Sequence, residues 1–339
     1  MFRKERIIRK IAIILVAALS ISLILTGCDS NSGGSSDRPA ASFPNRPITL
    51  IVPLAAGGGH DLTARPIVSC ITPYLGGTPM VAEIKSGAGG AIGSDYVAKS
   101  NPDGYTLLFG GNAMNVVLPM VEDLAYNSDD FVCIAKINQN YLSSITVHRD
   151  SPFQTLEELI EYGRQNPNTL RYPSTGLWGG LFMQASLFTS AAGIEAVHVP
   201  YESGGQAVQA LLSREVDFSF SLWSNSKDHY EAGTIRYLAT YEKQRSAETP
   251  DIPAITEFGF GEDVIYNSWR AVFAPKDTPQ EVVDYLREAF RQLCTEDTTF
   301  INLLRVLGDP VNYVDGPDFQ IMLDNEISNT QAIIDRVGK

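Results

Sequence analysis

An apolar, β-branched run that leads through a glycine-rich turn into a helix-like segment constrains the fold of this chain more than any other feature. Residues 48–52 read Ile-Thr-Leu-Ile-Val, which is typical of a buried strand, and residues 53–61 contain three consecutive glycines. Residues 62–74 then have a composition that fits a helix. This order predicts a strand, a tight turn and a helix, which together form the building unit of an α/β sheet.

The same unit returns further along the chain. Residues 169–172 have the pattern of a strand, residues 173–180 are a turn rich in small residues, and residues 181–192 are an apolar helical stretch. Both turns follow the carboxyl end of a strand, where the ligands of α/β sheets gather. The two turns are therefore expected to approach one ligand from opposite sides.

The rest of the chain continues the alternation of strands and helices. Thr278 is expected as the N-cap of one helix, with Pro279 at its first position. The alternation predicts an α/β fold with mainly parallel sheets and helices on both faces. Further strands are expected at residues 81–83, 105–109, 196–201, 216–220, 235–240 and 269–274, and further helices at residues 94–100, 205–213, 280–294 and 317–337.

The glycine turns also predict an anion site. Glycine lets backbone N–H groups come close to a ligand, and the free N–H groups at the start of a helix attract negative charge. Asp61 is expected to cap the first helix by accepting from these N–H groups. For each loop taken alone, a tight turn without a ligand is the alternative.

The net charge argues against nucleic acid as a partner, and the glycine spacing argues against a nucleotide. The formal net charge is −13 at pH 7, which disfavours nucleic acid and anionic lipid. Residues 87–93 are rich in glycine, but Ile92 stands where a dinucleotide fingerprint needs its third glycine.

Cysteine and histidine patterns predict neither a metal centre nor an active site. Cys70, Cys133 and Cys294 are widely spaced and have no neighbouring histidines, so no metal is expected, while a disulfide between two of them stays open. No GxSxG, HExxH or Walker motif surrounds a nucleophile or base. An enzyme and a cofactor are not expected, and a secreted hydrolase is only a remote alternative.

The N-terminus has the pattern of an export signal. Residues 1–27 begin with basic side chains and continue into an apolar run of about fifteen residues, which is short for a membrane span. Leu25-Thr26-Gly27-Cys28 resembles a bacterial lipobox, so Cys28 is expected to become the lipidated N-terminus. Residues 28–45 then predict a flexible tether. An extracytoplasmic protein is expected, anchored through its lipid in the periplasm or on the outer face of the cytoplasmic membrane; an uncut anchor is the alternative.

Several motifs together resemble the receptors of tripartite tricarboxylate transporters, the TctC-like or Bug family. The resemblance covers nearly the whole chain after Cys28. Its most specific segments are Arg46 to Pro53 with Gly57-Gly58 and Asp61 to Arg65, Gly87 to Gly90 with Ile92-Gly93, and Pro102 to Leu107; weaker support comes from His198 to Tyr201, Val216 to Phe218, and Ala274-Pro275 with Thr278-Pro279.

The resemblance implies a periplasmic-binding-protein fold of type II, in which two α/β lobes enclose a ligand cleft. Lobe one would comprise residues 46–145 and 270–339, and lobe two residues 146–269. It also implies a monomeric receptor that delivers a small carboxylate to the membrane subunits of a secondary transporter. A receptor that signals to a membrane kinase is the alternative.

The resemblance further implies that backbone N–H groups of two loops hold the ligand carboxylate. The departure from the family pattern at Trp178 and Phe182 predicts a ligand with an apolar or aromatic body, with simple packing of both rings as an equal alternative. The ligand class is open among di- and tricarboxylates, aromatic acids, amino acids and nicotinate-like compounds. The candidate contacts are Leu54, Ala55, Gly57, Gly58, Gly59, His60 and Asp61 in the first loop, Ser174, Thr175, Gly176, Trp178 and Gly179 in the second, and Asn112, Tyr201, Asp217, Trp223 and Trp269 near strand ends.

Overall fold

The computed structural model describes residues 43–139, 143–266 and 268–337. The chain separates into residues 1–43 and a compact unit of residues 44–339. The expected export signal, Cys28 and nearly all of the expected tether lie outside the described residues. Within the described part of the chain, none of the helices has the length and apolar character that crossing a membrane requires.

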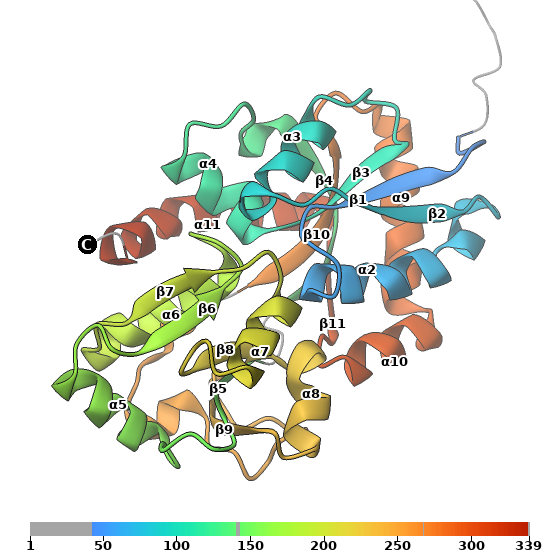
Figure 1. Ribbon diagram of the computed structural model, residues 1–339. Coiled ribbons are helices and arrows are strands. Elements are labelled where there is room, and N and C mark those ends of the chain that lie inside the picture. Colours follow the sequence, from blue (N-terminus) through green and yellow to red (C-terminus); the bar gives the residue numbers. More distant parts are fainter. Residues whose placement is uncertain (1–42, 140–142, 267, 338–339) are drawn as a thin grey trace, which may run out of the picture. The chain divides into compact units, whose positions relative to one another are not determined.

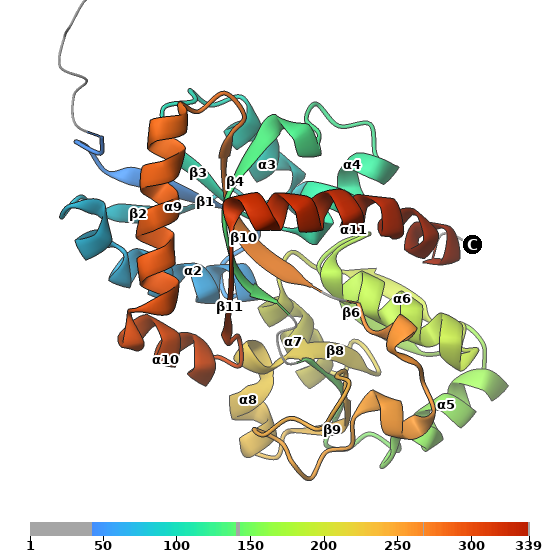
Figure 2. The same ribbon diagram turned by 180° about the vertical axis from the view of Figure 1, so that it is seen from behind.

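Lobe one, as the term is used below, is built on a six-stranded sheet in the order β11-β4-β10-β3-β1-β2. Figure 2 shows α9 and α11 on the near face of this sheet, with α3 behind it. The strands are β1 (Ile48–Val52), β2 (Met80–Ile84), β3 (Thr106–Gly111), β4 (Phe131–Gln139), β10 (Trp269–Pro275) and β11 (Val311–Asp315); the helices are α2 (Gly59–Cys70), α3 (Ala91–Ala98), α4 (Leu118–Val121), α9 (Gln280–Thr295), α10 (Thr298–Val306) and α11 (Gly316–Val337).

Lobe two contains an antiparallel three-stranded sheet, β8-β5-β9, and a parallel pair, β6-β7 (Figure 1). Its strands are β5 (Ser143–His148), β6 (Arg171–Ser174), β7 (Val197–Pro200), β8 (Ser219–Leu222) and β9 (Ile235–Thr240), and its helices are α5 (Leu156–Gln165), α6 (Gly180–Ala192), α7 (Gly204–Leu212) and α8 (Trp223–Glu231). A π-helical turn, η3 (Ala113–Val117), follows β3, and short 3-10 turns lie at η1 (Thr72–Leu75), η2 (Ala88–Gly90), η4 (Ser128–Asp130), η5 (Ile255–Phe258) and η6 (Glu262–Val264).

The two-lobe α/β fold is confirmed, but the sheets are mixed rather than mainly parallel. In lobe one β1 runs parallel to β2 and β3, whereas β10 runs antiparallel to both β3 and β4. The reason lies in the path of the chain, because β4 leads out of lobe one and β10 returns beside it. We propose the lobe boundaries expected from the sequence, since β5 and β10 begin within three residues of them.

The C-terminal helix α11 packs against both lobes. Near its start, the Phe319 ring lies edge-on to Trp269 of β10, with ring centroids 4.9 Å apart. Near its end, Ile334 is buried in the apolar core of lobe two, beside side chains of α6 such as Phe188. Figure 2 shows α11 running from the sheet of lobe one to α6. The helix therefore spans the junction between the lobes.

Two local expectations are wrong. Thr278 does not cap α9, because its hydroxyl donates to the Pro275 carbonyl (2.7 Å) and Pro279 takes the N-cap position. β8 begins at Ser219 rather than at residue 216, because the N–H groups of Asp217 and Phe218 both donate to the Arg171 carbonyl of β6.

The question left open for the cysteines is answered for the described residues. Cys70, Cys133 and Cys294 are all free thiols; Cys133 and Cys294 are buried, and Cys70 is half-buried. Burial raises the pKa of Cys133 to about 12, so this thiol stays protonated at neutral pH.

Candidate functional site

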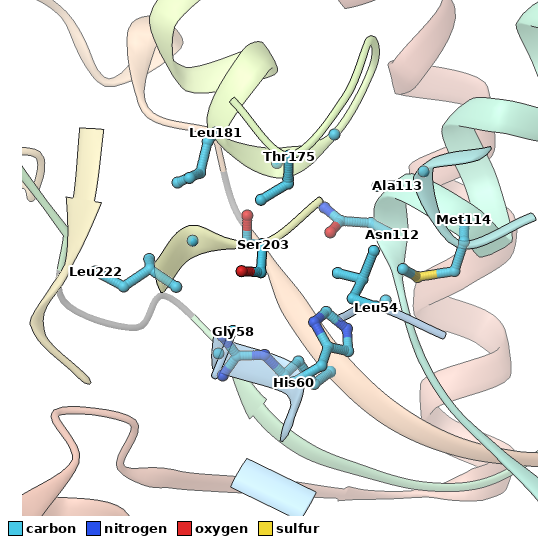
Figure 3. Close-up of a pocket in the computed structure, with 18 of the residues that line it drawn as sticks. Leu54, Gly58, His60, Asn112, Ala113, Met114, Thr175, Leu181, Ser203 and Leu222 are labelled. Atoms are coloured by element: carbon cyan, nitrogen blue, oxygen red, sulfur yellow. The ribbon is translucent and has the colours of Figure 1, made fainter. Parts of the chain in front are cut away.

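A cavity that is partly open to solvent lies between the two lobes. Figure 3 shows side chains and backbone from several separate segments facing it. The described residues that line it are Leu54, Gly58, Gly59, His60, Gly89, Gly111, Asn112, Ala113 and Met114 from lobe one, Thr175, Gly179, Gly180, Leu181, Gln184, Ser203, Gly204 and Leu222 from lobe two, and Ser268, Trp269 and Arg270 where the chain returns from lobe two to lobe one.

Three α-helices begin at this cavity. The N-cap residues of α2, α6 and α7 are Gly58, Gly179 and Ser203, and all three belong to its lining. The first backbone N–H groups of a helix have no partner inside the helix, and they carry the positive end of its dipole. The cavity therefore offers hydrogen-bond donors and positive potential from both lobes.

Glycine caps leave the donors of α2 and α6 uncovered by side chains. Neither Gly58 nor Gly179 makes a side-chain capping bond, because glycine has no side chain to make one. Ser203 differs, because its hydroxyl accepts from the N–H of Gln206 (3.3 Å) and so caps α7. The first turns of α2 and α6 are thus the freer donor sets for an anion.

Arg270 contributes a buried cation to the cavity wall. Its Nη1 lies 2.7 Å from Asp309 Oδ2, and both side chains are only 1% exposed. The same nitrogen donates to the Thr63 hydroxyl (3.1 Å). A Cβ on Gly59 would overlap Arg270 Nη2, so glycine at the start of α2 is what lets the guanidinium lie there.

His60 is a neutral histidine in the same wall. Burial, and then the charge of Arg270, lower the pKa of His60 well below 6.5, while an N–H donated to the Gly110 carbonyl acts in the opposite direction. The ring lies edge-on to Phe109, with centroids 5.6 Å apart. Its Nε2 is buried and has no hydrogen-bond partner among the described residues.

A family model described as the tripartite tricarboxylate transporter family receptor, TctC, matches residues 64–339. The chain belongs to this receptor family. A relative in Bordetella pertussis, named as a UPF0065 protein, is 32% identical over 90% of this chain and 93% of its own length. The family consists of solute-binding receptors, so the protein is a solute receptor and not an enzyme.

Two similar proteins of known structure are described with a carboxylate. Rpa4515 of R. palustris, described with adipate, is 28% identical and superimposes with a TM-score of 0.81 over 87% of this chain and 98% of its own. MatC from Rhodopseudomonas palustris, described with bound malate, is 25% identical, with a TM-score of 0.77 over 86% of this chain and 100% of its own.

The cavity of this TctC-family receptor brings together about half of the residues expected from its sequence. From the first glycine turn, Gly58 and Gly59 face it together with Leu54 and His60, and from the second turn Thr175 and Gly179 do so. The expected contacts at strand ends that line it are Asn112 and Trp269.

Asp61 does not have the capping role expected for it. It lies in the first turn of α2, and its Oδ2 accepts from the N–H of Gly57 (2.8 Å), a residue before the helix. Burial acts to raise the pKa of Asp61, but hydrogen bonds from Arg65 and Gly57 outweigh it, and the pKa is lowered. The carboxylate thus ties the glycine turn to the helix and does not line the cavity.

In the second glycine turn, two further expected contacts are used for packing. The Ser174 hydroxyl bonds His198 Nε2 and the Gly176 carbonyl, which holds the turn together. Trp178 has a positive φ of 64° and lies edge-on to Phe182, with centroids 5.7 Å apart, against the apolar cores of both lobes. The packing alternative for these two rings agrees with the geometry, since neither ring belongs to the lining of the cavity.

The remaining expected contacts lie elsewhere. Gly176 and Tyr201 line a neighbouring hollow that shares Leu54 and Thr175 with the cavity. Asp217 pairs with Arg171 (3.2 Å), and Trp223 packs against Tyr237 in lobe two, while neither Ala55 nor Gly57 is part of the lining.

Sequence reasoning missed two elements of the site. The third helix start, Ser203-Gly204, follows β7 in the sequence, and its Ser-Gly-Gly pattern was a usable signal for a helix start at a strand end. Arg270 follows Trp269 inside an otherwise apolar strand, and an arginine in such a run indicates a buried charge with a partner. The other lining residues that were not expected are Gly89, Gly111, Ala113, Met114, Leu181, Gln184, Leu222 and Ser268, while Gly180 is the last residue of the expected second turn.

Proposed function

We propose that this receptor binds a small carboxylate in the cavity between its lobes and delivers it to the membrane subunits of a tripartite tricarboxylate-type transporter. The observation that carries the proposal is the meeting of three helix N-termini, from both lobes, at one cavity. Adipate and malate in the descriptions of two similar structures agree with it.

In this proposal the first turns of α2 and α6 hold one carboxylate from opposite sides. Gly59 and Gly180 are the first residues of these helices, and both line the cavity. A negative charge there gains hydrogen bonds and the potential of both helix dipoles, and Arg270 adds its charge nearby. An anion held by both lobes favours the conformation in which they meet.

A contact between the lobes beside the cavity supports the proposal that they close on a ligand. Asn225 of α8 donates from Nδ2 to the carbonyl of Gly57 in the first glycine turn (2.7 Å). Closing the lobes on a ligand changes their outer surfaces, which is what a transporter subunit could recognise.

The membrane attachment belongs to the same proposal. An export signal over residues 1–27 and lipidation of Cys28 would place a monomeric receptor outside the cytoplasm, on a tether of residues 28–45. Mass spectrometry of the protein purified from membranes should find an acylated N-terminal cysteine, and Cys28→Ser should release the protein into the soluble extracytoplasmic fraction. An unmodified, uncut N-terminus would contradict this part of the proposal.

A thermal-shift screen of the protein, purified from membranes in mild detergent, tests the binding function. A ligand that binds only the folded state raises the melting temperature according to its concentration and dissociation constant. We expect a shift with at least one member of a panel of di- and tricarboxylates, aromatic acids and hydroxy acids, and its loss when the carboxylates are amidated. The absence of any shift across the panel would overturn the carboxylate proposal.

A further inference from the structure

One side-chain atom in the cavity wall has an unused hydrogen-bonding capacity. Nε2 of His60 is buried and has no partner among the described residues, although the residue lines the cavity and is only 8% exposed. An unsatisfied buried polar atom in a folded protein calls for an explanation, since most such atoms are paired. A ligand group that bonds to Nε2 would provide one.

Nε2 is an acceptor and not a donor. The pKa of His60 responds to the backbone carbonyl of Gly110, and because Nε2 is without a partner in the described part of the chain, we assign the ring proton to Nδ1, on the side of Gly110. The low pKa of His60 keeps the ring neutral, so Nε2 presents a lone pair. A ligand must therefore bring a hydrogen-bond donor to this point.

The backbone leaves room in front of this lone pair. A Cβ built on Gly111 would lie 3.0 Å from the Trp269 carbonyl oxygen, 3.1 Å from Nε2 and 3.4 Å from the sulfur of Met114, so the missing side chain leaves a small gap bounded by these atoms. Figure 3 shows His60 pointing into the region bounded by Ser203, Asn112 and Leu54. The unbranched Met114 side chain can move aside for an incoming group.

The charges around the cavity disfavour a cationic donor. Among the described residues that line it, none is an aspartate or a glutamate. Three helix N-termini contribute positive potential, and the charge of Arg270 acts on the ring of His60, while Asp309 balances much of the Arg270 charge further from the cavity. An ammonium group would be repelled there, whereas a hydroxyl would not.

We propose that the ligand is a hydroxycarboxylate, whose hydroxyl donates to Nε2 of His60 while its carboxylate lies against the first turns of α2 and α6. The proposal rests on the carboxylate-binding function above. His60 is the second residue of α2, so its side chain and the N–H donors of that turn lie close together. A hydroxyl one or two carbons from the carboxylate can therefore reach Nε2.

Matched pairs of acids that differ by one hydroxyl test this inference. The pairs are lactate and propionate, malate and succinate, citrate and tricarballylate, mandelate and phenylacetate, and 3-hydroxybutyrate and butyrate, with aspartate as the ammonium analogue of malate. Titration calorimetry of the purified protein should show that, in the pair that binds, the hydroxy acid binds about tenfold more tightly or better, the effect of leaving a buried acceptor unpaired. Aspartate should bind more weakly than malate.

Substitution of His60 links the preference to this side chain. In His60→Phe the ratio of the affinities for the hydroxy acid and the deoxy acid should fall about tenfold, because only the hydroxy acid loses a hydrogen bond. His60→Gln, which keeps an acceptor oxygen, should retain part of the preference. His229→Phe is the matched control, since this half-exposed histidine on α8 is not part of the lining.

The outcomes separate this inference from the proposed function. Equal affinities within every binding pair, or a preference that survives in His60→Phe, overturn the role of His60 and leave carboxylate binding intact. A preference for aspartate over malate overturns the choice of hydroxyl over ammonium. If neither member of any pair binds, both the inference and the proposed function fail. Should His60→Phe not fold, the preference of the unaltered protein within a pair still decides.

Discussion

Trp269 Nε1 donates a hydrogen bond of 2.6 Å to Oε2 of Glu326, and this bond joins the strand that returns from lobe two to the C-terminal helix. Asn112 also donates to Glu326, so two residues of the cavity wall depend on one carboxylate. Burial raises the pKa of Glu326, and the bonds from Trp269 and Asn112 act against this rise. α11 therefore supports the site from behind, although Glu326 is not in the lining.

Glu326→Ala should lower the free energy of unfolding by about 1–3 kcal/mol, because the buried indole N–H of Trp269 loses its acceptor. Ligand affinity should fall as well, since Trp269 and Asn112 lose their positions. Urea unfolding followed by tryptophan fluorescence measures the first effect, and calorimetry the second. Glu326→Gln keeps an acceptor and should cost clearly less. An alanine variant as stable as its parent would show that this bond contributes nothing.

Breaking the buried pair of Arg270 and Asp309 should be among the most damaging single changes. Arg270→Met leaves the Asp309 carboxylate buried without its partner, at a cost of about 3–5 kcal/mol in the free energy of unfolding. Arg270→Met combined with Asp309→Leu should recover much of that loss but not the ligand affinity, because the cation is still missing.

The exposed pair of Arg245 and Glu257, with an N–O distance of 2.6 Å, is the control for burial. Both side chains are more than 40% exposed, so Arg245→Met should cost at most about 1 kcal/mol. Chemical denaturation compares the two variants directly. Similar losses for Arg270→Met and Arg245→Met would mean that burial of the first pair does not govern its contribution.

The hydrogen bond from Asn225 to the Gly57 carbonyl should slow the release of a bound ligand. Asn225→Ala removes a contact that exists only when the lobes meet, so the dissociation rate should rise about fivefold, as expected for the loss of about 1 kcal/mol. Stopped-flow displacement measures this rate.

Asn166→Ala is the matched control for the contact between the lobes. Asn166 also donates from Nδ2 to a backbone carbonyl, that of Tyr162, at 2.9 Å, but both residues are in lobe two. Its loss should leave the release rate unchanged. If both variants release ligand at the parent rate, the Asn225 contact has no part in holding the lobes together.

His60 should make the folded protein less stable in mild acid. Its pKa is lowered in the folded state, so below pH 6.5 the unfolded chain binds the proton more readily, and stability falls as the pH decreases towards the folded pKa. The loss is at most about 1.4 kcal/mol per pH unit in that window.

His60→Phe should therefore flatten the change in melting temperature between pH 7 and pH 5. The charged group that acts on His60 is Arg270, which does not titrate in this range. His229→Phe, measured in the same way, is the control for the loss of a histidine that is only half-buried. An unaltered slope in His60→Phe would mean that the ring does not stay neutral through burial.

Most of the strands and the two glycine turns could be predicted, because their signals are local. Residues 48–52 and 235–240 form strands with the expected bounds, and α6 and α11 begin one residue before their expected starts. The wrong predictions concern which group a side chain bonds to, and the sequence pattern does not specify that. The Asp61 carboxylate accepts from the N–H of Gly57 instead of capping α2, and the Thr278 hydroxyl donates to the Pro275 carbonyl instead of capping α9. In each case the side chain bonds to a backbone group nearby in the sequence.

The candidate site was less predictable than the fold. His60, Gly58 and Gly179 were expected as contacts because they flank glycine turns, and they do line the cavity. Trp223 was chosen for its place at a strand end, yet its ring packs against Tyr237 and does not line the cavity. Distance along a strand does not say which way a side chain turns.

The sequence by itself determined that strands alternate with helices and that a glycine-rich turn joins a strand to a helix in two places, because both depend on residues close together in the chain. Only the tertiary structure decided that β10 returns antiparallel beside β4, that α7 adds a third N-terminus, and that Arg270 and Asp309 pair in the wall. It also decided that Nε2 of His60 is left, among the described residues, as an unpaired acceptor. These features arise from contacts between residues far apart in sequence, and such contacts exist only once both lobes have packed.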